Sequence, residues 1–153
     1  MRVVVRGLLV LVAFALVFAP PAAGATPLER DLVREMNRVR SVHGRAPLRV
    51  DAVLTRAASA HSEDMLARSR FSHGKFAERM RRFGARSPLL GENLAWASGA
   101  NATAAAIVRM WMRSPGHRAN LLRRSFRRIG VAARTGTMKG VEGAVVVTAD
   151  FGG

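Results

Sequence analysis

The sequence contains no cysteine among its 153 residues. Disulfide bonds, on which many small exported domains depend, are therefore excluded, and the core must be held by packing alone. A cysteine nucleophile and a lipid-modified cysteine are excluded for the same reason. The sequence also lacks an HExxH motif, a glycine loop of the phosphate-binding type and a GxSxG motif, so these common catalytic signatures do not apply.

Acidic residues and lysine are scarce as well. Ten Asp and Glu residues and two lysines stand against 23 arginines, and the formal charge is +15. Such a charge attracts nucleic acid, acidic membrane surfaces or anionic envelope polymers, but a solvated basic surface without a dedicated partner explains it equally. Two clusters stand out, "RMRRFGAR" at 79–86 and "RRSFRR" at 123–128. Neither has the aromatic interleaving of a nucleic-acid motif.

The N-terminus has the organisation of a secretory signal peptide. Arg2 and Arg6 precede an uncharged apolar run at 8–19, and Ala23-Gly24-Ala25 offers the small-x-small pattern of a cleavage site. The run is 12 residues long, whereas a membrane-spanning helix needs about 20. We therefore expect a signal peptide at 1–25 and a secreted or periplasmic protein, with an uncleaved membrane anchor as the alternative. Export makes nucleic acid an unlikely physiological partner.

The mature region, 26–153, is long enough for one compact domain but not for two, and we expect it to be a monomer. Apolar residues recur at three- and four-residue steps in several segments, and the last segments have the pattern of a β-hairpin. Helices followed by strands in one small domain favour the α+β class, with helices packed on a sheet. The patterns predict helices at 28–43, from Asp51 to about Met65, up to Phe83, at 103–114 and within 116–125, and strands at 90–98, 128–134 and 142–151.

A polar sequon opens one of these predicted helices. Asn101-Ala102-Thr103 matches the N-glycosylation acceptor pattern. Polar residues at the start of a helix are also typical N-caps, and they need no glycan to explain them. We therefore interpret this segment as a helix cap.

Two of the four histidines have a plain structural interpretation. His61 lies on the apolar stripe of its predicted helix and is expected to be a satisfied, buried histidine. His43 stands at the end of the preceding helix, where an imidazole can bond the last carbonyls.

His73 and His117 differ, because each adjoins a glycine near the end of a predicted helix, where a side chain can turn into a cleft. Glu92, in "LLGENLAWAS", is a carboxylate at the start of an apolar strand. Two imidazoles and one carboxylate can hold a catalytic Zn²⁺ with an open position for water. A polar network that merely orders the cleft is an equally good account.

Five segments stand out by their order along the chain: "MNRVRSVHGRAPLRVDAVLTRAASAHSEDM", "FSH", "GENLAWAS", "WMRSPGHRANLL" and "RIGVAA". This order resembles that of the CAP superfamily, also called the SCP domain, which includes cysteine-rich secretory proteins, antigen 5 and plant pathogenesis-related proteins. The resemblance covers about 28–151, and the lack of cysteine is similar to the bacterial branch. It implies a single α-β-α sandwich.

The resemblance also implies a central cleft with two histidines and two glutamates. His73, Glu92 and His117 match three of these four residues. The second glutamate, which family members carry shortly after the tryptophan, has no counterpart, because Arg113 and Ser114 stand there. Glu92 is therefore expected to be the lone acid of its cleft.

Two asparagines and two tryptophans complete the matched segments. Asn93 and Asn120 match family positions, and we interpret both as structural hydrogen-bonding residues. Trp96 and Trp111 are expected in the core and the cleft wall, since tryptophan buries a large apolar area.

Three functions remain open at this point. The first is a secreted binding module without turnover, whose cleft takes a divalent metal or a small or lipidic ligand and whose basic surface meets an anionic envelope polymer or lipid. The second is a metal-assisted hydrolase, such as a peptidase, which the missing second glutamate weakens. The third is a cationic binder of envelope or nucleic-acid surfaces, which rests on charge alone.

Overall fold

The computed structural model describes residues 24–153, so the predicted signal peptide at 1–25 lies almost entirely outside the described residues. Within them, no helix is both long and apolar enough to cross a membrane. The elements in chain order are α1 (Pro27–Val42), β1 (Arg49–Val50), α2 (Ala52–Ala67), α3 (Phe76–Phe83), β2 (Leu90–Ala97), the short 3₁₀ turn η1 (Gly99–Asn101), α4 (Ala104–Arg113), α5 (Pro115–Leu122), β3 (Arg128–Met138) and β4 (Val141–Gly152).

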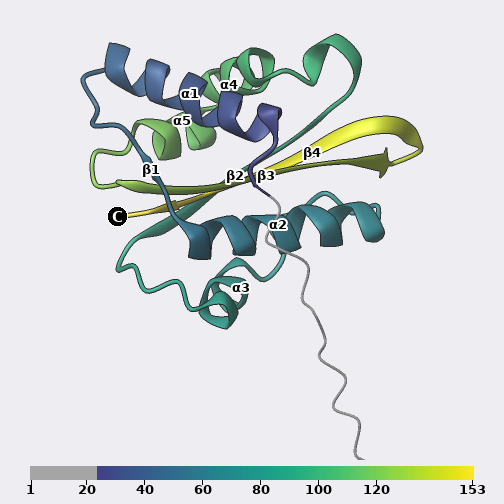
Figure 1. Ribbon diagram of the computed structural model, residues 1–153, viewed down its shortest axis with the longest axis horizontal. Coiled ribbons are helices and arrows are strands. Elements are labelled where there is room, and N and C mark those ends of the chain that lie inside the picture. Colours follow the sequence, from purple (N-terminus) through teal and green to yellow (C-terminus); the bar gives the residue numbers. More distant parts are fainter. Residues whose placement is uncertain (1–23) are drawn as a thin grey trace, which may run out of the picture.

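The elements form three layers around one sheet (Figure 1). The strand order is β1-β3-β4-β2, with β1 parallel to β3 and the other neighbours antiparallel. Helices α1, α4 and α5 cover one face, and α2 and α3 lie on the other. This arrangement confirms the α+β class and the single α-β-α sandwich. Strand β2, which carries Glu92, is an edge strand of the sheet.

Side chains cap the starts of α1, α2 and α4. Thr26 and Glu29 form a reciprocal capping box at α1, and the Asp51 carboxylate accepts from two backbone N–H groups at the start of α2. The Thr103 hydroxyl accepts from the Ala106 N–H at α4. Each cap satisfies donors that the first turn of a helix leaves unpaired. The cap interpretation of Thr103 is therefore confirmed.

The sheet extends further than the sequence pattern indicates. The two-residue strand β1 was missed, since two residues show no periodicity. The hairpin strands continue into "TGTMKG", which the sequence analysis took for a turn, because β3 and β4 pair as far as Met138 and Val141. Lys139 and Gly140 alone make the turn, with φ of 48° and 81°. Left-handed residues at both positions match the twist of antiparallel strands.

The core is divided by the sheet. The larger part lies under α1, α4 and α5, where Trp111 is fully buried and its indole N–H donates to the Leu94 carbonyl at 2.9 Å. Smaller clusters lie under α2 and α3 around Met65 and Met80. The prediction that Trp111 is a core residue is confirmed, and Trp96 is partly buried against the second cluster.

Arg40 is a fully buried charge in α1. Its guanidinium donates to the carbonyls of Ala46, Leu121, Arg123 and Phe126, at 2.7–3.2 Å. Four carbonyls replace the water that a buried cation loses. Arg40 thereby ties the α1–β1 loop to the α5–β3 loop.

Helix α2 packs directly on the sheet at Gly130, where a Cβ atom would lie 2.0 Å from the Leu54 carbonyl carbon and 2.2 Å from the Thr55 nitrogen. Backbone atoms cannot move aside as a side chain can. We expect Gly130→Ala to lower the free energy of unfolding by about 3 kcal/mol or more. Urea denaturation followed by circular dichroism measures this change.

Gly116→Ala is the matched control, because a Cβ there meets no atom within 4 Å. Its free energy of unfolding should stay within about 0.5 kcal/mol of wild type. Equal stability of the two variants would contradict the close packing of α2 on β3.

Candidate functional site

Glu92 lies at the centre of a charged network at the edge of the sheet. Its side chain is only 2% exposed. One carboxylate oxygen accepts from His73 Nδ1, in the α2–α3 loop, at 2.7 Å. The other accepts from Arg79 Nη2 of α3 in a short hydrogen bond. His73 and Glu92, two of the three predicted site residues, are thus in direct contact. Arg79 was missed because nothing in its basic cluster singles it out.

His61 completes this network from α2. Its Nδ1 accepts from Arg79 at 3.0 Å, and its Nε2 donates to the Ser72 carbonyl at 2.9 Å. Burial first and the Arg79 charge second lower the pKa of His61 to about 4, so the imidazole stays neutral. The expected satisfied, buried histidine is found, but it also lies 3.8 Å from Glu92.

Asp150 corrects the expectation that Glu92 is the lone acid. The register of β2 and β4 sets Asp150 directly opposite Glu92, and directly opposed residues of antiparallel strands share a face. Asp150 is fully buried, and no donor among the described residues reaches either carboxyl oxygen. Spacing along the chain could not reveal this pair, since 58 residues separate its members.

The two carboxyl groups face a single guanidinium. Burial first and the Glu92 charge second raise the pKa of Asp150 well above its usual range. Burial also raises the pKa of Glu92 to about 7, although the Arg79 charge opposes this rise. One cation balances one negative charge, so the pair retains a proton at neutral pH. The retained proton belongs to the pair of carboxyl groups and not to either one alone.

His117 approaches from the other side of β2, on the first turn of α5. Asn93 donates to the His117 carbonyl at 3.0 Å, and Asn120 donates to the Glu92 carbonyl at 3.1 Å and to Asn93. These bonds confirm the structural interpretation of both asparagines. Burial and then the charge of nearby His73 lower the pKa of His117. Its Nδ1 is buried without a hydrogen-bond partner in residues 24–153.

The predicted metal set is not assembled as three ligands around one point. No group of three or more His, Asp or Glu side chains in residues 24–153 is placed to hold a metal ion. Both oxygens of Glu92 are engaged by His73 and Arg79. Metal binding through His73, Glu92 and His117 stays a prediction. Within residues 24–153, His73 Nε2 and His117 Nδ1 have no hydrogen-bond partner. Glu92 accepts the hydrogen bond that orients His73.

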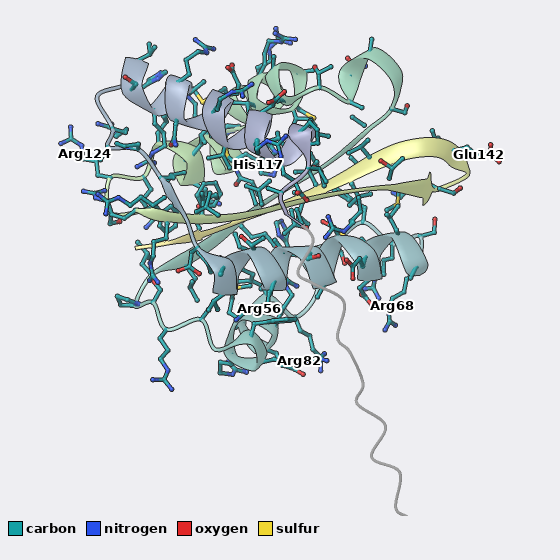
Figure 2. The ribbon with its side chains drawn as sticks, viewed as in Figure 1. Arg56, Arg68, Arg82, His117, Arg124 and Glu142 are labelled. Carbon is teal, nitrogen blue, oxygen red and sulfur yellow. The ribbon has the colours of Figure 1, made fainter. Side chains whose placement is uncertain are left out.

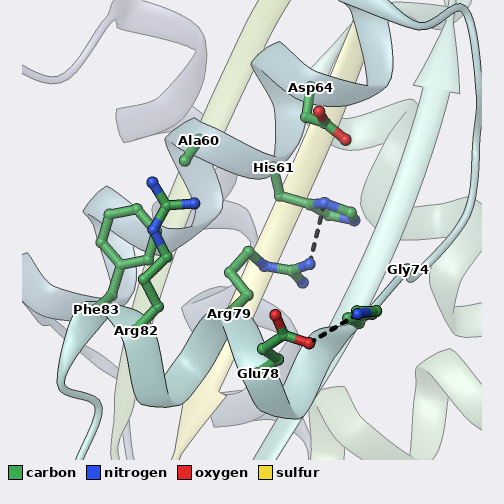
Figure 3. Close-up of a pocket in the computed structure, with 9 residues that line it drawn as sticks. Ala60, His61, Asp64, Gly74, Glu78, Arg79, Arg82 and Phe83 are labelled. Atoms are coloured by element: carbon green, nitrogen blue, oxygen red, sulfur yellow. Dashed lines mark hydrogen bonds and ion pairs between the residues drawn. The ribbon is translucent and has the colours of Figure 1, made fainter.

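A pocket of about 290 Å³ opens on the far side of Arg79, between α2 and α3 (Figure 3). His61 and Arg79 form its inner wall, and the dashed line between them marks their hydrogen bond. Asp64, Glu78 and Arg82 surround the opening. Arg79 therefore separates this pocket from the carboxylate of Glu92.

Comparisons with known proteins identify the family of this chain. Residues 33–151 match the family model described as CAP, the cysteine-rich secretory protein family. The chain therefore belongs to the CAP family, although it contains no cysteine itself.

Three similar proteins come from bacteria. YkwD of Bacillus subtilis (strain 168), an uncharacterized protein, is 35% identical over 118 residues, which are 74% of this chain and 44% of YkwD. This chain thus spans less than half of that relative. An extracellular, SCP-domain protein of Bacillus anthracis is 28% identical, with a TM-score of 0.68 over 86% of this chain and 45% of that one. An outer surface protein of Borrelia burgdorferi shares the fold at 19% identity, with a TM-score of 0.69 over 83% and 95% of the two chains.

The acid pair predicts how stability depends on pH. An acid with a raised folded-state pKa stabilises the protein below its unfolded pKa, and this contribution is lost as pH rises through the folded value. Between pH 7 and 9 the free energy of unfolding should therefore fall as the pair ionises. Asp150→Asn keeps the size of the side chain but cannot ionise. We expect its decrease to be smaller by about 1–2 kcal/mol.

Urea denaturation at pH 7 and pH 9 measures this difference. Glu142→Gln, at the exposed end of the β3–β4 hairpin, is the control and should keep the wild-type pH dependence. An unchanged pH dependence in Asp150→Asn would contradict the shared proton.

Proposed function

We propose that this chain is an exported CAP-domain binding protein whose cleft at the edge of β2 takes a ligand without chemical turnover. The observation that carries the proposal is the engagement of Glu92. His73 and Arg79 occupy both of its oxygens, and its side chain is almost fully buried. Glu92, the acid most suited to catalysis, therefore has a structural role in the site.

A hydrolase would need a free base close to a bound water. Glu92 is held by a guanidinium, and Asp150 is fully buried behind it. The neutral His61 is also committed, because both of its ring nitrogens have partners. These features favour binding over hydrolysis.

The imidazoles of His73 and His117 are the groups that would hold a divalent cation such as Zn²⁺. His73 donates through Nδ1 to Glu92, which leaves the lone pair of Nε2 free on a side chain that is 58% exposed. A carboxylate on the opposite nitrogen is the usual support for a metal-binding histidine. The unpartnered Nδ1 of His117 is the second such donor. In this proposal Glu92 orients His73 and does not coordinate the ion.

Export is part of the proposal. It rests on the charged, apolar and small-residue segments of the first 25 residues. The names of two structural relatives, an extracellular protein and an outer surface protein, support it. We also propose that the protein acts as a monomer.

Zinc binding to the exported protein tests the cleft. Calorimetric titration should show one site in wild type, which His73→Ala and His117→Ala each abolish because a single imidazole remains. Glu92→Gln should weaken zinc about 10- to 100-fold, the usual effect of losing a group that orients a ligand. His43→Ala, whose imidazole bonds the Val39 carbonyl at the end of α1, should bind as wild type. Identical binding by wild type and the two cleft variants would remove the metal from the proposal.

Turnover assays test the absence of catalysis. We expect no product from peptide or cell-wall substrate panels when zinc is present in excess. A reaction that Glu92→Gln abolishes, in a variant with wild-type circular dichroism, would establish the hydrolase instead.

A further inference from the structure

We infer that one end of the molecule is a docking surface for an anionic phospholipid membrane. We call this surface the arginine end, and it consists of the α1–β1 and α5–β3 loops with the strand residue Arg49. It does not involve the cleft. Its basic residues are Arg45, Arg49, Arg123, Arg124 and Arg127.

The two loops lie side by side. The backbone N–H of Arg49 donates to the Arg127 carbonyl at 2.9 Å, and Arg45 Nε donates to the Leu122 carbonyl at 2.9 Å. The buried guanidinium of Arg40 bonds carbonyls of both loops. These contacts gather arginines from distant parts of the sequence on one small surface.

No acidic side chain in residues 24–153 forms an ion pair with an arginine of the arginine end. All ten acidic residues lie within the described part of the chain, and eight of them form ion pairs with other residues. The nearest in sequence, Asp51, pairs with Arg128 at 3.2 Å. Asp150 is buried beside Glu92. Glu142 lies at the opposite end of the molecule from Arg124 along its longest axis (Figure 2).

The interior adds to this positive charge instead of cancelling it. Arg40 lies directly behind the loops, and its pKa is lowered by burial and then by the charges of Arg127 and Arg45. The carbonyls of Leu121, Arg123 and Phe126 turn inward to Arg40. The negative ends of these peptide dipoles are therefore directed away from the surface. An approaching anion therefore meets arginines that no acidic side chain of residues 24–153 pairs.

Exposed aliphatic side chains distinguish a membrane from a soluble polyanion. Val42, at the end of α1, is 72% exposed, and Val50, next to Arg49, is 66% exposed. Both flank the α1–β1 loop. A lipid interface accepts valine among its headgroups and phosphates beside the guanidinium groups, which bind phosphate through two parallel hydrogen bonds. A soluble polyanion gains nothing from the valines.

Vesicle co-sedimentation tests this surface with protein recovered after export. The probes are vesicles of phosphatidylcholine with an equal part of phosphatidylglycerol, and vesicles of phosphatidylcholine alone. We expect binding to the first only. Each basic residue near an anionic surface strengthens binding roughly fivefold, so replacing Arg49, Arg123 and Arg124 together by Gln should weaken it about 100-fold.

A matched control removes the same charge elsewhere. Arg81, Arg82 and Arg86 are exposed on and after α3, and their triple replacement by Gln should change vesicle binding less than about threefold. Each triple contains one arginine that lies over a phenylalanine ring. Arg123 lies 5.5 Å above the Phe126 ring, and Arg82 lies 5.9 Å above the Phe83 ring.

Two further variants separate the possible results. Val42→Ser with Val50→Ser should weaken vesicle binding and leave binding of soluble polyphosphate unchanged. His73→Ala with His117→Ala should leave vesicle binding at the wild-type level, so the cleft and the surface can fail independently. Equal losses in the two arginine triples would overturn the docking surface. Binding of polyphosphate but not of anionic vesicles would overturn the membrane as its partner.

Discussion

The ion pair between Arg79 and Glu92 is the constraint on which the site and much of its surroundings depend. A carboxylate buried at the edge of a sheet costs several kcal/mol unless a cation and hydrogen bonds replace its water. Arg79 supplies the cation from α3, and His73 supplies a donor from the loop before it. The short helix α3, which lacks a side-chain cap at its start, is thereby fastened to β2. The same bond that neutralises Glu92 also positions Arg79 in the wall of the pocket between α2 and α3.

The buried charges of this protein are balanced in two different ways. In the site, two carboxyl groups meet one guanidinium, and the pair of acids balances the charge by retaining a proton. At the arginine end, Arg40 has no carboxylate and is instead surrounded by carbonyl oxygens. In both places an arginine side chain holds neighbouring segments of the chain together. Because the chain has few acidic residues, its arginine side chains must find their partners mainly among backbone oxygens or in a binding partner.

The sequence alone predicts local features well and distant pairings poorly. The caps at Asp51 and Thr103 and the periodicity of the helices located most elements, because these signals lie within a few residues of each other. The set of His73, Glu92 and His117 depended on family resemblance, since spacings of 19 and 25 residues carry no geometry. Asp150 and Arg79 were missed because β-strand register and helix docking brought them to Glu92. Neither can be read from local pattern.

The missing side chain at Gly130 sets the height at which α2 rests above the sheet. His61 and Ser62 are carried on α2, where Ser62 contacts Thr148 of β4 at 2.8 Å and His61 holds Arg79. A helix lifted by even one methyl group would carry His61 away from Arg79 and alter the partner of Glu92. The absence of a Cβ atom at Gly130 therefore determines how closely His61 approaches Arg79. Through Arg79 it also determines how firmly the charges around Glu92 are held.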